Sequence, residues 1–228
     1  MAQKKQISES IQLGIILALA GGFMDAYSYV CRGHVFANAQ TGNILLFGVN
    51  MSEGHFKIAA YYALPVIAFA MGIAIAATIR HRLKDKSLLH WRQISVTIEI
   101  IFLCIVALLP QSLNMLANSI TSLACGIQVQ SFRKINGNGM ATTMCIGNLR
   151  TGTQAICDYW HTKDKEHAKK AGLFYGIILC FAIGAIIGNK CVEVFAEKAI
   201  AGSAFFLVIG FFIMFIDMEK KTKDKGEL

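Results

Sequence analysis

The stretch IQLGIILALAGGFMDAYSYV, residues 11–30, decides the fold class. It is apolar almost throughout, and Asp25 is the only charged side chain in it. A helix of roughly 20 mostly apolar residues is long enough to cross a bilayer. The whole chain agrees, because 55% of its residues are hydrophobic and only 16% are charged, against about 25% charged in soluble domains. The sequence therefore predicts an all-α integral membrane protein.

Further apolar blocks follow the first one along the chain. Each is long enough, or nearly long enough, to span a membrane as a helix. Together with residues 11–30 they predict six transmembrane helices in a single membrane domain, residues 1–228, which ends in a tail at 218–228. The other five blocks are Ala59–Ile79, Ile94–Leu109, Leu113–Phe132, Gly172–Gly188 and Ala199–Ile216.

Basic residues predict the orientation. If the N-terminus is cytoplasmic, six crossings place residues 80–92, 132–170 and 218–228 on the same side. These regions and the N-terminus hold 18 of the 22 Lys and Arg residues. Cytoplasmic loops accumulate Lys and Arg, so we expect both termini in the cytoplasm. The same bias explains the net charge of +8 through topology and lipid headgroups, with no nucleic-acid partner.

An internal repeat organises the chain. At an offset of 105 residues Gly21 aligns with Gly126, and Gly42-Asn43 aligns with Gly147-Asn148 without a gap. We therefore divide the chain into a first repeat, residues 12–110, and a second, residues 113–217. Each repeat holds three spans, so the second enters the membrane from the opposite side. This 3+3 inverted repeat is frequent among secondary transporters.

Each repeat contains a Gly-Asn segment between its first two spans, Val35–Asn50 and Met140–Trp160. Both segments are only partly apolar. One interpretation makes them re-entrant loops, which membranes tolerate where protein or a watery cavity satisfies the backbone. The other makes them surface loops, each with a short interfacial helix. The sequence favours the first interpretation without excluding the second.

Asp25 is the ionisable residue that points most directly to function. A charge near the bilayer centre costs about 3 kcal/mol or more, so carboxylates there are functional-site candidates. The alternative is a carboxyl near the interface, bound to a neighbouring helix or to Ser28. Glu99 lies in the third predicted span, nearer the cytoplasmic face, and either serves function or reaches towards Arg92 or water.

Polar residues of the Gly-Asn segments complete the candidate site. Asn and Thr are good helix N-caps, and the free amides of helices starting there would favour an anion or a polar oxygen. Arg150 would add to that attraction, or else be solvated. Helix capping alone also accounts for these residues. We expect substrate contacts from Asp25, Asn38, Thr41, Gly42, Asn43, Gln128, Gly147 and Asn148.

These motifs resemble a known family. The run Gly21–Tyr29, the run Phe36–Asn43 and the second-half pieces Ala124–Gln128, Ala141–Thr143 and Gly147–Leu149 are similar to the signature of the YoaK family of bacterial membrane proteins. This chain departs from it at Ile146, where related sequences have threonine. The resemblance implies a multi-pass helical fold in the bacterial cytoplasmic membrane. It implies no activity.

Small residues recur every four positions in several spans, as in Gly172, Gly176, Cys180, Gly184 and Gly188. Such faces allow close helix packing in lipid, and a homo-oligomer could use the same faces. The sequence holds no HExxH, GxSxG or P-loop motif, and it predicts no cofactor and no metal site. A transporter or channel for a small solute is the leading hypothesis. The alternatives are a non-catalytic membrane subunit or regulator and an intramembrane enzyme.

Overall fold

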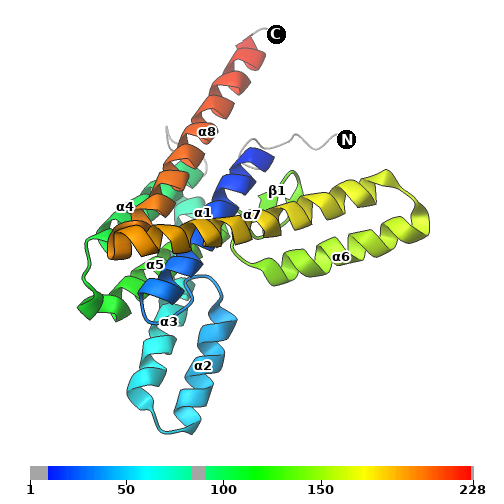
Figure 1. Cartoon of the computed structure of the whole chain (residues 1–228). Helices are drawn as coiled ribbons and strands as arrows, with labels where there is room; N and C mark the ends of the chain where they lie inside the picture. Colours follow the sequence, from blue (N-terminus) through cyan, green and yellow to red (C-terminus); the bar gives the residue numbers. More distant parts are fainter. Residues whose placement is uncertain (1–9, 84–90, 227–228) are drawn as a thin grey trace.

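The structure is a computed structural model that describes residues 10–83 and 91–226, with side chains described as far as Met214. The basic residues Lys4 and Lys5 and the stretch 84–90, used above for orientation, lie outside these ranges. Helices dominate the described chain (Figure 1). The elements are α1 (Ile11–Cys31), α2 (Gln40–Ser52), α3 (Phe56–Leu83), α4 (Trp91–Ala107), η2 (Gln111–Leu113), α5 (Asn114–Ser131), β1 (Lys134–Ile135), β2 (Asn138–Gly139), α6 (Cys145–Thr162), α7 (Lys165–Phe195), η3 (Ala196–Ile200) and α8 (Ala201–Gly226).

The predicted apolar blocks coincide with α1, α3, α4, α5, α7 and α8. Within the described residues, three helical segments are long and apolar enough to cross a membrane: Ile11–Cys31, Phe56–Leu83 and Lys165–Met214. The last of these contains α7, η3 and residues 201–214 of α8. The helical membrane class is thus confirmed, while the six-span count stays a prediction. α8 continues through Gly226, so residues 218–226 of the predicted tail are part of this helix.

Two helix crossings are the most extensive in the described chain, α1 against α7 and α3 against α5. In the first, a Cβ at Gly22 would overlap the carbonyl oxygen of Phe181. In the second, a Cβ at Gly126 would overlap the carbonyl oxygen of Phe69. Both crossings therefore depend on glycine, as expected where helices pack closely in lipid. They also show that Gly22, rather than Gly21, is the packing counterpart of Gly126.

The small-residue face of α7 serves this packing only in part. Gly184 and Gly188 lie against α1, where a side chain would meet the backbone of Leu19 and of Phe23. Nothing lies within 4 Å of a Cβ built at Gly172 or Gly176. The face is therefore a packing surface in its C-terminal half and is open in its N-terminal half.

Helices α1 and α8 run antiparallel. A Cβ at Gly210 would lie 3.3 Å from Leu13, near the start of α1, and one at Gly202 would lie 2.8 Å from the ring of Phe23. Between these contacts Ser203 Oγ donates to the α1 backbone at a distance of 3.2 Å. The N-terminal end of α1 and the C-terminal part of α8 consequently lie on the same side of the molecule (Figure 1).

Arg32, the residue that follows α1, is fully buried. Its guanidinium donates to Tyr27 Oη at 2.7 Å, to Asn114 Oδ1 at 3.1 Å and to the carbonyls of Val106 and Leu109 at 3.1 and 2.8 Å. The carbonyl end of a helix carries partial negative charge. Arg32 therefore binds the C-terminal end of α4 to the end of α1.

The one departure from helix in the described chain, apart from loops, is the short antiparallel pair β1 and β2. Asn136 and Gly137 form its turn with positive φ angles of 51° and 80°. Two such residues in succession match the Asn-Gly turn that closes two-residue hairpins. The side chain of Ile135 from this hairpin fills the space beside Gly14 of α1.

Candidate functional site

Asp25 is held by the chain that follows α1. Its Oδ1 accepts from the backbone N–H of Asn38 at 2.7 Å, and the amides of Ala37 and Ala39 also act on the carboxylate. These amides precede α2, whose N-terminal end favours negative charge. Ser28, the partner suggested by the sequence, donates instead to the backbone oxygen of Asp25 at 3.2 Å.

Two loops reach the middle of α1. Asn38, in the loop before α2, donates from Nδ2 to the Gly21 carbonyl at 3.2 Å. Thr143, in the loop before α6, also packs against Gly21, because a Cβ built at Gly21 would lie 2.9 Å from the methyl carbon of Thr143. Gly21 is the eleventh of the 21 residues of α1. Segments more than 100 residues apart in sequence thus meet at the midpoint of one helix.

A pocket of about 690 Å³ lies between these loops. The first loop, the second loop, α1 and α7 all contribute to its wall. Of the predicted site residues, Asp25, Asn38 and Thr41 line this pocket, and Gly42, Asn43, Gln128, Gly147 and Asn148 do not. Its lining comprises Asp25, Ala26, Tyr29, Phe36, Asn38, Ala39, Gln40, Thr41, Thr143, Met144, Cys145, Ile146 and Phe181.

Asn38 and Thr143, two residues of the pocket lining, each have a buried side-chain oxygen that lacks a hydrogen-bond partner among the described residues: Oδ1 of Asn38 and Oγ1 of Thr143. Their residues are 1% and 2% exposed. An unpaired buried acceptor costs about 1–3 kcal/mol, so a hydrogen-bond partner at either atom would stabilise the protein. Thr143 is absent from the sequence-derived site, although the offset of 105 residues aligns it with Asn38 and could have indicated it.

Asn43 and Asn148 take a different place from the one expected. α2 begins at Gln40 and α6 at Cys145, so both asparagines lie one turn inside their helices, and the N-cap interpretation is wrong. Asn43 Nδ2 donates to the Phe36 carbonyl at 2.7 Å, and Asn148 Nδ2 donates to the Ala141 carbonyl at 2.6 Å. In both cases the acceptor is seven residues earlier. These amides close the loops.

Asn43 uses its whole amide in this way. Its Oδ1 accepts from the Phe36 N–H at 3.0 Å, and its Nδ2 also donates to Gln40 Oε1 at 2.9 Å. Gly42 supports the same loop, since a Cβ there would lie 2.7 Å from the Phe36 ring. These residues shape the wall of the pocket through Phe36.

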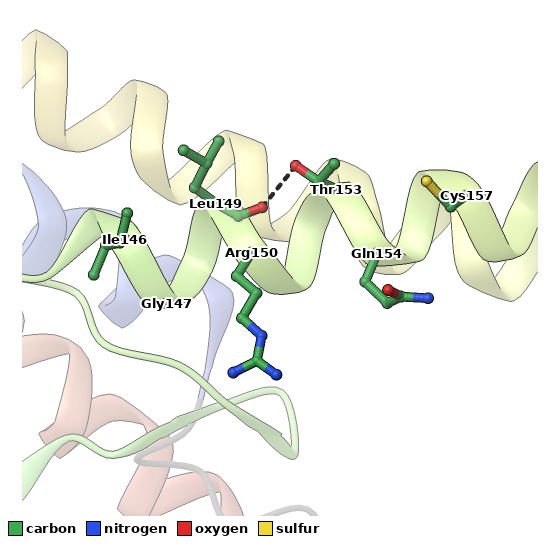
Figure 2. Close-up of a pocket in the computed structure, with 7 residues that line it drawn as sticks. All are labelled: Ile146, Gly147, Leu149, Arg150, Thr153, Gln154 and Cys157. Atoms are coloured by element: carbon green, nitrogen blue, oxygen red, sulfur yellow. Dashed lines mark hydrogen bonds between the residues drawn. The ribbon is translucent and has the colours of Figure 1, made fainter.

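Gly147 lies on the exposed side of α6, where a second pocket follows one face of the helix (Figure 2). A Cβ at Gly147 would have nothing within 4 Å. Arg150 and Gln154 extend from this face in Figure 2. The pocket is lined by α6 alone, through Ile146, Gly147, Leu149, Arg150, Thr153, Gln154 and Cys157.

Gln128 and Glu99 lie in the interior. Gln128 Nε2 donates to the Leu17 carbonyl at 3.0 Å and so links α5 to α1. Glu99 is fully buried, so the expectation that it reaches water is wrong. Both of its carboxyl oxygens lack hydrogen-bond partners among the described residues. Within the same residues, no group of three or more His, Cys, Asp or Glu side chains is arranged for a metal ion.

Comparison with known proteins gives a consistent result. The family model described as "Protein of unknown function (DUF1275)" matches residues 13–213. The chain is 24% identical over 182 residues to the UPF0700 transmembrane protein YoaK of Bacillus subtilis (strain 168), covering 75% of this chain and 79% of the relative. No solved structure matches.

Proposed function

We propose that this chain, which belongs to the DUF1275 family of membrane proteins of unknown function, moves a small solute across the membrane through the pocket beside Asp25. The observation that carries this proposal is the meeting of Asn38 and Thr143 at Gly21, the midpoint of α1. A ligand pocket near mid-membrane, formed by interrupted backbone from both halves, is the usual place of a transport site.

The proposal includes the six-span inverted repeat of residues 12–110 and 113–217. The paired crossings at Gly22 and Gly126 support it. The equivalent bonds of Asn43 and Asn148, each to a residue seven positions earlier, support it as well. In this arrangement the loops before α2 and α6 are re-entrant, one from each side of the membrane.

Both termini are cytoplasmic in the proposed orientation. The antiparallel packing of α1 and α8 supports an even number of crossings, and the distribution of basic residues supports the direction. We expect reporter fusions after Leu228 and within residues 80–92 to report the cytoplasm. An external signal from either fusion would contradict the proposed topology.

A test of transport without a known solute uses Cys145, which lines the pocket and is partly exposed. The variant keeps Cys145 and the fully buried Cys125 and replaces the other cysteines. We expect a membrane-impermeant thiol reagent to modify Cys145 in right-side-out vesicles and also in inside-out vesicles. A transport pathway must be open to water from each side at some time.

The matched control keeps Cys104 in place of Cys145. Cys104 is exposed on α4, on a surface that faces lipid in the proposed arrangement, so the same reagent should leave it unmodified in both preparations. Modification of Cys145 from one side only, or from neither, would overturn the transport proposal. It would leave a membrane subunit or regulator with a closed pocket.

A further inference from the structure

The pocket beside Asp25 carries negative charge without a basic residue in its lining. Asp25 is the only acidic residue of its lining, and the lining contains no Lys, Arg or His. The carboxylate already accepts from the Asn38 amide before α2, so negative charge is present at that helix end. An anionic ligand would therefore meet a carboxylate without a compensating cation in the wall.

The unpaired atoms of the wall favour a ligand that donates hydrogen bonds. Asn38 Oδ1 is an acceptor, and Thr143 Oγ1 accepts as well as donates. Neither has a partner among the described residues, and both residues are at least nine-tenths buried. A ligand with several N–H groups suits a site where the carboxylate and both unpaired oxygens can accept. Bonds that involve a charged partner are roughly twice as strong as neutral ones.

The remainder of the wall is aromatic and apolar. Tyr29 and Phe36 stack with ring centroids 5.0 Å apart, and Phe181 of α7 contributes a third ring. Aromatic faces attract organic cations, while Met144 and Ile146 offer contact to a hydrocarbon body. The volume of about 690 Å³ is within the range of small-molecule sites.

From these observations we propose that the pocket binds a small organic ammonium ion. Its N–H groups bond Asp25 and lie beside Asn38 and Thr143, the residues that carry the two unpaired oxygens, and its apolar part lies against Tyr29 and Phe36. That the ion is transported rests on the proposed function. That the pocket binds an ammonium ion rests on the residues of the pocket alone. The sequence led us to expect an anion or a polar oxygen as the ligand at the helix ends. We now propose a cation as the ligand of the pocket.

The test measures how fast a neutral thiol reagent modifies Cys145 in purified protein that retains only Cys145 and Cys125. Three probes of similar size differ in charge: butylammonium, 1-pentanol and valerate. We expect butylammonium to slow the modification, and 1-pentanol and valerate to have little effect. Equal protection by valerate, or no protection by butylammonium, would overturn the cation assignment. Neither result depends on whether Cys145 is reached from both sides of a vesicle, which tests transport separately.

Two variants locate the ammonium group. Asp25→Asn should weaken protection by butylammonium about tenfold or more, because it removes the charge. Asp25 also holds a loop, so Thr143→Val serves as a second variant: it removes an oxygen that bonds no described residue and nearly preserves the shape. We expect several-fold weaker protection than in the control, with the rate of each variant in the absence of probe as its own reference. Thr151→Val, outside the pocket lining, is the control. Protection in Thr143→Val equal to that in the control would overturn the assignment.

Discussion

The loop and helix at residues 36–52 and the loop and helix at residues 141–157 are built alike and differ in what surrounds them. In each, an asparagine one turn into the helix bonds the carbonyl seven residues earlier. Phe36 of the first unit places its ring against Gly42. Ala141 of the second has no ring, and Gly147 is open. The comparison teaches that the asparagine is needed to close each loop, whereas the glycine is needed only where a ring covers it.

The outward faces of α2 and α6 differ as well. Leu45 and Val49 of α2 are exposed and apolar, while Arg150 and Gln154 stand at the same positions of α6 after the offset of 105 residues. Exposed apolar side chains suit contact with lipid. An arginine at membrane depth needs water, headgroups or a protein partner. At these two positions the outward face of α6 is therefore more polar than that of α2.

Substitution of the two asparagines should have the largest effect. Asn43→Leu removes three hydrogen bonds and leaves backbone groups of Phe36 unpaired, which should cost about 3 kcal/mol or more. Asn148→Leu removes one bond and should cost about 1–3 kcal/mol. Thermal unfolding of each variant in detergent measures the difference. Unchanged stability in both variants would show that these amides do not close the loops.

The outward faces give the second prediction. Leu45→Arg should reduce membrane insertion by up to about 3 kcal/mol, the insertion cost of an arginine near the bilayer centre. Arg150→Leu should leave insertion unchanged or improve it. The amount of membrane-integrated protein after expression measures both. Equal tolerance of arginine on the two helices would mean that α2 does not face lipid.

The glycines give a smaller contrast. Gly42→Ala places a Cβ 2.7 Å from the Phe36 ring, and overpacking of this kind costs about 1–3 kcal/mol. Gly147→Ala meets nothing within 4 Å and should stabilise α6 by up to about 1 kcal/mol through helix propensity. Unfolding temperatures of the two variants should therefore move in opposite directions.

The smallest expected effect is a coupling between Phe36 and Gly42. Phe36→Ala makes the first unit resemble the second, so Gly42→Ala should cost about 1 kcal/mol less in that background than in the native chain. A double-mutant cycle on thermal stability measures this difference. Additive costs would show that the ring does not explain the glycine.

Most of the fold and part of the site follow from local sequence. The helical blocks were predicted from apolar length, because a bilayer demands the same length of every span. Asp25, Asn38 and Thr41 line the pocket, and their role in binding a substrate stays a prediction. Asn43 and Asn148 were placed there because glycine-asparagine pairs suggest caps, and a cap cannot be distinguished by sequence from an asparagine one turn further into a helix.

The sequence by itself determined that this protein lies in a membrane and where its long apolar helices run. These properties depend on composition and spacing along the chain. Tertiary structure alone decided that Arg32 is buried, that Thr143 shares a pocket with Asp25, and that Gly22 is the residue at the helix crossing. Those properties depend on contacts between segments far apart in sequence, and such contacts are set by how whole helices pack.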